Sequence, residues 1–323
     1  MLAGQIKNIR QIGLIDHPEP ELVKPNQVIF QPEMACLCGS DSPYFNKEQP
    51  SYPLPIGMSL HEMVGTVICS NGGNFKVGQR VLAVPPNHEG IFERMVISED
   101  KVVPLESSRP SEEMVIAQPL GTVLYGLRKL PNLLGWKVAV VGQGPIGQLF
   151  CSALKNLGAS EVIAIDVLAS RLQISKLMGA SAVIDNSRDD PVQAVQDLTG
   201  GEMVDLVVEA AGHQGESLNL CIEICRNQGR LHYFGIAPQT INGVEWLKVV
   251  TKSLNITSSH SPDFKIDFPL AIKWITEERI DVRPLITHKL PLNRIQHAFE
   301  LFSGRLDGAL KVCLKFPVDN LDK

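Results

Sequence analysis

The sequence carries no excess of positive charge. It has 35 Asp and Glu against 30 Lys and Arg, and its formal net charge is −5 at pH 7. A chain without a basic field has little attraction for a polyanion, so we expect no nucleic-acid binding. The chain also lacks an apolar run of the roughly 18 residues that a membrane-spanning helix needs, so we expect no membrane span. Its first residues, MLAGQIKNIR, lack the apolar core of a signal peptide.

The cysteines form no disulfide framework. There are seven of them, an odd number, scattered without regular spacing along the chain. This usage is typical of reduced thiols, and we expect a cytoplasmic protein. Internal repeats and low-complexity tracts are absent as well. The hydrophobic fraction of 44% and the charged fraction of 20% are those of an ordinary globular protein.

Strand-like runs and turns dominate residues 1–117. Runs such as MVGTVICS and RVLAVP are rich in β-branched residues and are separated by prolines and glycines. This pattern predicts an all-β domain, compatible with a partly closed barrel. A length of 323 residues favours about two domains, so we expect a second one after residue 117.

Strands and helices alternate in residues 118–260. The strands are apolar throughout, as in KVAVV and EVIAID, which is typical of a parallel sheet covered by helices on both faces. Residues 261–323 hold two amphipathic helical stretches and a closing strand, ALKVCLKF. The predicted fold class is therefore α/β, with a β-rich domain, a doubly wound parallel-sheet domain and a C-terminal segment.

A glycine-rich turn follows the first of these strands and opens a helix. Residues 142–147 read GQGPIG and fit the dinucleotide fingerprint G-x-G-x-x-G. The first glycine allows the tight turn, the second admits a pyrophosphate, and the third lets the helix pack closely on the strand. The helix N-terminus then offers unpaired N–H groups and a partial positive charge to the phosphates. The residues expected to bind the cofactor at this turn are Gly142, Gly144, Pro145, Ile146 and Gly147.

Asp166 ends the next strand, 19 residues beyond Gly147. A carboxylate at this place can accept hydrogen bonds from both hydroxyls of an adenosine ribose. It would repel a 2′-phosphate, so the sequence predicts NAD rather than NADP.

Cys38 and the pair His61-Glu62 raise the question of a metal. A catalytic zinc takes about three protein ligands, often from distant segments, and keeps one position open. HEMVG lacks the second histidine of the zincin helix, so a metalloprotease is not supported. The spacing alone leaves two interpretations open: a catalytic metal site, or a buried thiol beside a turn.

Several separated motifs together resemble the zinc-dependent medium-chain dehydrogenase/reductase family, nearest its sorbitol and threonine dehydrogenase branch. They occur in the family's order and span nearly the whole chain. The resemblance implies a GroES-like catalytic domain in residues 1–117, a Rossmann domain in 118–260, and a segment 261–323 that returns to the catalytic domain. The motifs are Cys38–Asp41, His61–Val67, Phe75–Val81, Gln118–Leu120 and the tail at 284–302.

The resemblance also implies roles for single residues. Cys38 and His61 would be zinc ligands, with Glu62 a ligand or close neighbour and Gln118 at a further metal position. Asp41 would accept a hydrogen bond from the other nitrogen of His61 and fix its tautomer. The remaining roles are proton relay for Ser40, substrate-pocket aromatic for Tyr44, nicotinamide contact for Thr122, and a cation beside the ribose for Arg171.

The chain departs from the family pattern at three places. Gln118 stands where relatives have glutamate or cysteine, and a neutral amide binds zinc more weakly than either. Leu60 replaces the glycine that usually precedes the histidine. The cysteine-rich lobe that holds a structural zinc is absent, so we expect one catalytic zinc and no structural zinc. His88 and Glu89 form a second His-Glu pair, but they lie in a polar loop, and we expect them to be solvated.

The resemblance predicts an NAD-dependent, zinc-containing dehydrogenase of the alcohol or polyol type. It would transfer hydride between NAD and a small alcohol, such as a diol, a polyol or a hydroxy-amino acid, and form a homodimer or homotetramer. One alternative is a zinc-free reductase of the same fold that reduces activated double bonds with NAD(P)H. Another is a dinucleotide-binding protein without turnover, for which Gln118 is the only support.

Overall fold

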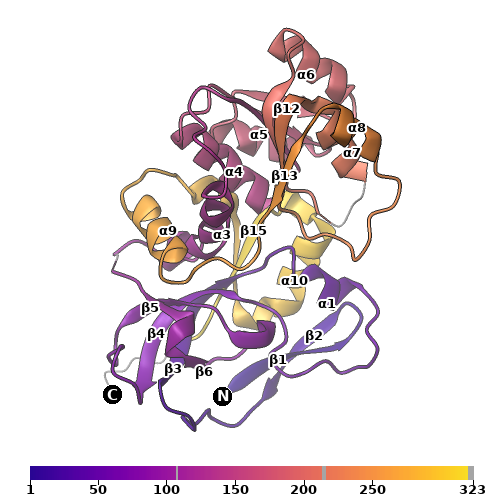
Figure 1. The fold of residues 1–323 in the computed structure, drawn as a ribbon. Coiled ribbons are helices and arrows are strands. Elements are labelled where there is room, and N and C mark those ends of the chain that lie inside the picture. The colour runs from indigo at the N-terminus through magenta and orange to yellow at the C-terminus, as the bar shows by residue number, and fades with distance from the viewer. Residues whose placement is uncertain (107, 213–215, 319–323) are drawn as a thin grey trace. The chain divides into compact units, whose positions relative to one another are not determined.

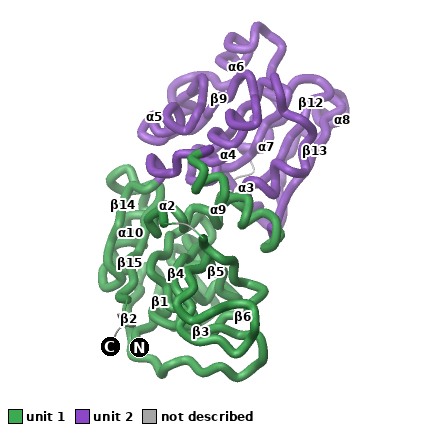
Figure 2. Tube along the Cα trace, turned by 90° about the vertical axis from the view of Figure 1, so that its left-hand side faces the viewer, with its two compact units in different colours: residues 1–121, 263–278, 286–323 green, residues 122–262, 279–285 purple. Residues whose placement is uncertain are grey.

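The chain folds into two compact units (Figure 2). The computed structural model describes residues 1–106, 108–212 and 216–318. Unit 1 comprises residues 1–121, 263–278 and 286–323, and unit 2 comprises residues 122–262 and 279–285. The chain passes from unit 1 to unit 2 within helix α3 (Ala117–Leu127), and the C-terminal part contributes to both units.

Unit 1 is built on a seven-stranded sheet, which confirms the β-rich character expected of the N-terminal part. The order is β14-β15-β3-β4-β5-β7, with β6 also paired to β3, and every pair except β14 with β15 is antiparallel. A separate antiparallel pair is formed by β1 (Leu2–Asn8) and β2 (Gln11–Asp16). The sheet strands are β3 (Gln27–Cys36), β4 (Glu62–Ser70), β5 (Arg80–Ala83), β6 (Met95–Ser98), β7 (Val102–Pro104), β14 (Ile286–Pro291) and β15 (Lys311–Lys315).

Helix α2 packs on β3 and β4 of this sheet and α1 packs on β1, while the longer helices α9 and α10 come from the C-terminal part of the chain (Figure 1). Helix α10 packs on β15 and β2. The ring centroid of its Phe299 lies 5.2 Å from that of Phe45 of α1 inside the core of the unit, with the two rings tilted by 47°. The helices are α1 (Ser42–Asn46), α2 (Ser111–Met114), α9 (Asp267–Thr276) and α10 (Ile295–Gly304), with 3-10 turns at Pro86–His88, Glu99–Lys101, Leu292–Arg294 and Leu306–Gly308.

Unit 2 is a six-stranded sheet in which every pair is parallel, as the alternation of strands and helices predicted. The order is β10-β9-β8-β11-β12-β13, so the chain starts in the middle and winds outward in both directions. Helices α4 and α5 pack on the β8–β10 half, and α7 packs on β11 and β12. The strands are β8 (Lys137–Val141), β9 (Glu161–Asp166), β10 (Ala182–Asp185), β11 (Val204–Glu209), β12 (Cys225–Tyr233) and β13 (Asn255–Ser258). The helices are α4 (Pro145–Asn156), α5 (Ala169–Leu177), α6 (Pro191–Thr199), α7 (Glu216–Ile224) and α8 (Trp246–Thr251), with a 3-10 turn at Arg283–Leu285.

Helix α6 shows how local sequence sets element ends in this unit. The Asp190 carboxylate accepts hydrogen bonds from the first free N–H groups, and Pro191 occupies the first turn, where no N–H is needed. Gly200 then ends the helix in a left-handed conformation, with φ of +66°. None of the described helices has the length and apolar character that crossing a membrane requires.

Candidate metal centre and dinucleotide site

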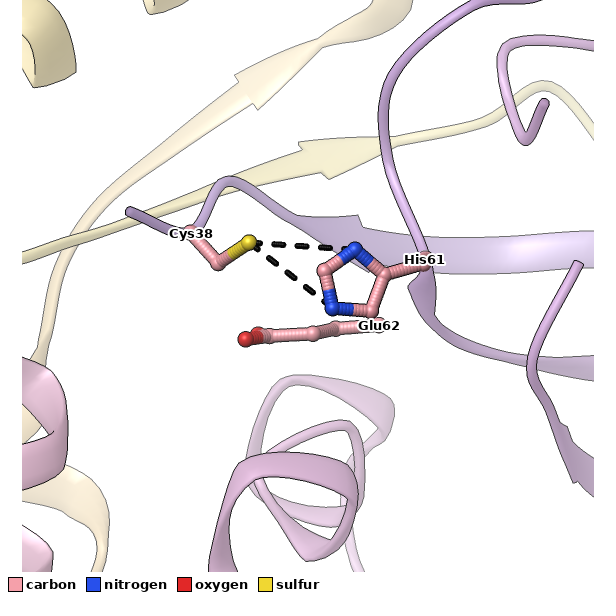
Figure 3. A group of neighbouring side chains, drawn as sticks. All are labelled: Cys38, His61 and Glu62. Carbon is pink, nitrogen blue, oxygen red and sulfur yellow. Dashed lines mark hydrogen bonds between the residues drawn. The ribbon is translucent and has the colours of Figure 1, made fainter. Parts of the chain in front are cut away.

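Three side chains with metal-binding atoms meet in unit 1. Cys38 follows β3, and His61 and Glu62 stand where β4 begins. The two strands are antiparallel with Cys36 opposite Glu62, so the end of one strand meets the start of the other. One ligand atom from each of the three side chains lies within 4.8 Å of the other two (Figure 3). Strand pairing therefore brings together residues that are separated by more than twenty positions in the sequence.

The donor set suits zinc, which proteins bind through thiolate, imidazole and carboxylate groups. Zinc–ligand bonds of about 2.0–2.3 Å in a tetrahedron place the donor atoms about 3.3–3.8 Å apart. Cys38 Sγ lies 3.8 Å from both Nδ1 and Nε2 of His61, close to that separation. Cys38, His61 and Glu62 are the residues that would hold the ion.

Burial holds the Cys38 sulfur in its thiol form when no metal is bound. Removal from water raises the pKa of this thiol well above its ordinary value, and the carboxylates of Asp41 and Glu62 raise it further. Lys311 and the Ser40 hydroxyl act in the opposite direction. Ser40 Oγ lies 2.7 Å from Cys38 Sγ, so the expected relay residue is in direct contact with the sulfur.

A buried lysine lies beside these groups, and the sequence analysis missed it. Lys311 of β15 is 1% exposed, and its ammonium donates to the Glu62 carboxylate and, at 3.0 Å, to the carbonyl of Leu37. Burial raises the pKa of Glu62, and Lys311 opposes this shift. Burial disfavours the ammonium too, but the neighbouring Glu62, Cys36 and Cys38 leave the pKa of Lys311 above its ordinary value. The available signal was a lysine flanked by apolar residues on both sides, at Leu310-Lys311-Val312 in ALKVCLKF.

Asp41 has a different partner from the one expected. Its buried carboxylate accepts from the N–H of Cys38 at 2.7 Å, the hydroxyl of Ser59 at 2.6 Å and the N–H of Leu60 at 2.9 Å. The expected hydrogen bond from His61 to Asp41 is therefore wrong for the described residues, because Asp41 is engaged by the turn before His61 and by the backbone of Cys38.

The turn that Asp41 holds is strained. Ser59 and Leu60 have φ values of +97° and +62°, a left-handed region in which residues with side chains are uncommon. Leu60 thus keeps a backbone conformation that glycine adopts easily, and its side chain is fully buried in the core of unit 1. Such strain persists only where surrounding bonds fix it, and here those bonds present His61 to Cys38.

His88 is half-buried and lies against His61, a contact that the expectation of a solvated His-Glu pair did not include. The Nδ1 atoms of the two rings are 3.1 Å apart, and the rings meet edge to face with centroids 4.5 Å apart. Tyr44 of α1, the expected pocket aromatic, is half-buried, and its ring centroid lies 6.3 Å from that of His88. His88 therefore neighbours both a metal-site residue and the expected substrate-pocket residue.

Two expected residues lie in α3, outside this cluster of contacts. Gln118 is 6% exposed, and none of the hydrogen bonds among the described residues joins it to Cys38, His61 or Glu62. Thr122 is half-buried one helical turn further on. A metal role for Gln118 and a nicotinamide contact for Thr122 stay predictions.

In unit 2, the glycine turn has the geometry that a dinucleotide requires. Gly142 has a φ of +93°, and a Cβ atom there would lie 2.5 Å from the backbone nitrogen of Ala211. Gly144 faces open space at the start of α4, whereas a Cβ atom at Gly147 would lie 1.9 Å from the carbonyl oxygen of Gly142. Pro145 and Ile146 form the first turn of α4 and are half-exposed. One glycine therefore makes the turn, one leaves an approach open, and one allows close packing.

Asp166 lies beside this turn at the end of β9. Its carboxylate accepts from the N–H groups of Gln143 at 2.6 Å and Leu168 at 2.9 Å, and it is 9% exposed. A guanidinium nitrogen of Arg171 lies 3.8 Å from the same carboxylate. The structure thus brings the expected ribose carboxylate and its neighbouring cation together.

Comparisons with known proteins agree with this arrangement. Residues 24–106 match a family model described as "Alcohol dehydrogenase GroES-like domain", and residues 145–277 match one described as "Zinc-binding dehydrogenase". The L-threonine 3-dehydrogenase of Rhizobium rhizogenes is 27% identical over 333 residues, covering 93% of this chain and 95% of that protein. Sorbitol dehydrogenase of Rattus norvegicus is 27% identical over 340 residues, covering 94% and 92%. The solved structure of galactitol-1-phosphate dehydrogenase from Escherichia coli has the same fold, with a TM-score of 0.88, 21% identity, and coverage of 98% of this chain and 100% of that one.

Proposed function

Because the chain belongs to the medium-chain dehydrogenase/reductase family of zinc-dependent alcohol dehydrogenases, we propose that it transfers hydride between a small polar alcohol and NAD at a single zinc centre. The chain is an oxidoreductase of the alcohol or polyol dehydrogenase type. The observation that carries the proposed mechanism is the convergence of Cys38, His61 and Glu62 on one point.

The side chains at this centre have different roles. Cys38 and His61 hold the ion, and Glu62 is a third ligand or a close anionic neighbour whose charge Lys311 balances. When bound, the zinc supplies a Lewis acid that makes the substrate hydroxyl more acidic, and the dinucleotide accepts the hydride. Ser40, in contact with the Cys38 sulfur, passes the hydroxyl proton toward solvent.

We assign a further metal position to Gln118. Its amide oxygen is a weaker zinc ligand than the carboxylate or thiolate of relatives, and it carries no charge. We propose one catalytic zinc per chain, and the donor cluster of Cys38, His61 and Glu62 supports it.

The preference for NAD rests on Asp166. Its carboxylate lies at the carboxyl end of β9 beside the glycine turn, where it can accept from the two ribose hydroxyls. A 2′-phosphate at that place would face a negative charge, and the nearby Arg171 is already paired with the carboxylate. Thr122 would contact the nicotinamide end of the same cofactor.

The substrate class follows the named relatives, which act on threonine and sorbitol. We propose a diol, a polyol or a hydroxy-amino acid, because these share a secondary hydroxyl beside further polar groups. Tyr44 and His88 offer a phenol and an imidazole beside the metal site, and both can hydrogen-bond such a neighbouring group.

We also propose that the protein is a homo-oligomer of the cytoplasm. Strand β13 is an edge of the sheet in unit 2, and its open edge can pair with another copy. Exposed apolar side chains lie on β13 itself, at Ile256, and on the preceding helix α8, at Trp246, Leu247 and Val250. All seven cysteines are free thiols, as expected in a reducing compartment.

The proposed function is tested by metal content and turnover together. Purified protein should contain one zinc per chain and reduce NAD with at least one alcohol in a panel of diols, polyols and hydroxy-amino acids. Cys38→Ala and His61→Ala should lose both the zinc and the turnover while keeping NADH affinity. Cys69→Ala, at a half-buried thiol outside the donor cluster in β4, is the matched control and should keep all three. Turnover that persists in zinc-free protein would contradict the mechanism.

A further inference from the structure

His61 has two ring nitrogens, and His88 lies against one of them. We propose that His88 is the positioning residue that fixes the orientation and tautomer of His61 as a metal ligand. This inference rests on the proposed zinc centre and goes beyond it, because it assigns a role to a loop residue for which the motifs of the sequence gave none.

The geometry of the two rings requires unequal roles. Their Nδ1 atoms are 3.1 Å apart, which is a hydrogen-bond distance between nitrogens, and the ring planes are inclined by 72°. In a pair of neutral imidazoles, one nitrogen must carry the hydrogen and the other must accept it. If His61 donates from Nδ1 to His88, its Nε2 has a lone pair for the ion. Ligating histidines usually use their second nitrogen in this way, most often toward a carboxylate, a carbonyl or water.

Asp41 is the carboxylate that would otherwise take this part, and it is committed elsewhere. One of its oxygens accepts from the N–H of Cys38, and the other accepts from Ser59 and Leu60. These bonds fix the backbone on both sides of the metal site. They leave the orientation of the His61 ring to another group, and the His88 imidazole lies 3.1 Å from its Nδ1, closer than the Cys38 sulfur at 3.8 Å.

The loop that carries His88 is fastened to the turn before His61. The N–H of Ser59 donates to the carbonyl of His88 at 2.5 Å, and the N–H of Gly90 donates back to the carbonyl of Ser59 at 3.0 Å. The N–H of Ile91 donates to the carbonyl of Gly57 at 3.0 Å. A Cβ atom at Gly90 would lie 2.2 Å from the carbonyl oxygen of Leu60, so the two segments approach as closely as backbones can.

His88 has a left-handed backbone conformation, and the hydrogen bonds between the two segments stabilise it. Its φ is +57° and that of the preceding Asn87 is +56°. Histidine and asparagine tolerate this region better than most residues, but a pair of them in sequence still stores strain. The loop therefore fixes the direction in which the His88 imidazole leaves the backbone. A fixed imidazole can hold a second one in place, whereas a mobile one could not.

The inference is tested with His88→Leu and His88→Asn. An asparagine amide can present a polar atom near the position of Nδ1, and a leucine cannot. Zinc affinity is measured by competition with a chromophoric chelator. His88→Leu should bind zinc about 10–100-fold more weakly than the natural chain, the usual effect of removing such a partner, and His88→Asn should recover most of the loss. His288→Leu changes a histidine of unit 1 that bonds to Thr287 and Asp307 instead, and it should keep natural affinity.

Cobalt substitution supplies a readout that separates positioning from ligation. The visible spectrum of the Co²⁺ form should keep its tetrahedral intensity and band positions in His88→Leu, because the ligands are unchanged. Equal zinc affinity in His88→Leu and the natural chain would overturn the inference, as would a Co²⁺ spectrum that loses a nitrogen ligand. A natural chain that binds no zinc would instead contradict the proposed function, so the two failures are distinguishable.

Discussion

Lys311 and Glu62 form an ion pair in the interior of unit 1, with their side chains 1% and 3% exposed. They lie on β15 and at the start of β4, on either side of β3 in the sheet. A buried pair of this kind contributes little net stability, because both charges lose their water, but removing one partner leaves the other charge uncompensated. The pair also sets the charge next to Cys38, since the ammonium of Lys311 binds the Glu62 carboxylate, which has an oxygen within 4.8 Å of the sulfur.

Replacing Lys311 alone should therefore be costly. We expect Lys311→Met to lower the free energy of unfolding by about 3–5 kcal/mol, as measured by urea unfolding. The double variant Lys311→Met/Glu62→Gln should recover a large part of the loss, because it leaves no buried charge unpaired. Lys315→Met, at the exposed end of the same strand, is the control and should change stability little. A single variant as stable as the natural chain would contradict the buried pair.

Zinc binding should release a proton from Cys38. The pKa of this thiol lies well above its ordinary value because of burial and the nearby carboxylates, so the metal-free protein carries the proton throughout the neutral range. Zinc takes the thiolate, and its affinity should rise about tenfold per pH unit between pH 7 and 8.5. Chelator competition across this range measures the slope. Cys38→Ala should bind zinc weakly, and its zinc affinity should change less with pH. A zinc affinity of the natural chain that does not change with pH would contradict the proton release.

The second and third glycines of the turn should respond differently to one added methyl group. Gly147→Ala should lower the free energy of unfolding by about 1–3 kcal/mol, because its Cβ would collide with the carbonyl of Gly142. Gly144→Ala should keep stability, since its Cβ meets open space, but should weaken NADH binding by closing the approach of the pyrophosphate. Thermal unfolding and NADH fluorescence titrations measure the two effects. If Gly144→Ala lowered stability and Gly147→Ala weakened NADH binding instead, the dinucleotide would not lie at this turn as proposed.

Discrimination against NADP should depend on the charge of Asp166. Asp166→Asn retains an oxygen that can accept from Gln143 or Leu168, but it removes the negative charge that a 2′-phosphate would face. We expect the ratio of NADH to NADPH affinity to fall by roughly tenfold, equivalent to about 1.4 kcal/mol of lost repulsion. Titration with both cofactors gives the ratio. If the ratio does not move, another group selects the cofactor.

His232 should make unit 2 sensitive to acid. Its imidazole is fully buried between Thr257 and Ser259, and burial lowers its pKa to about 4 from an ordinary 6.5. The unfolded chain therefore binds a proton at a higher pH than the folded chain, and stability present above pH 6.5 is lost as the pH falls toward 4. Lowering the pH from 7.5 to 5 should reduce the free energy of unfolding by about 2 kcal/mol through this residue. In His232→Gln, the free energy of unfolding measured with urea should fall less between pH 7.5 and 5 than in the natural chain. An equal fall in both proteins would show that His232 is not the cause of the acid sensitivity.

The sequence was sufficient for elements whose pattern is local. The apolar strands of unit 2, the glycine turn and Asp166 lie where periodicity and spacing predicted them, because each depends on residues close together in the chain. Cys38 and His61 are different. Their meeting depends on the register of β3 against β4, which spacing does not give, and the family resemblance supplied it.

The partners of the metal-site residues were not predictable in the same way. His88 lies in a polar loop, and its contact with His61 follows from backbone hydrogen bonds between two irregular segments that have no periodic signature. Asp41 was assigned to His61 by analogy, but the left-handed turn at Ser59 and Leu60 takes its oxygens. The burial of Lys311 was not predictable from its own strand. It depends on the Glu62 carboxylate, which lies on another strand far away in the sequence.

The Cys38 and His61 side chains stand at the paired ends of β3 and β4, and this position has a consequence for the whole unit. An ion held there would act as a staple across the central strands of the sheet, so that losing it would loosen one half of the molecule and spare the other. Chelator-treated protein should then be cut by proteases first in unit 1, while the parallel sheet of unit 2, with its own core, stays resistant.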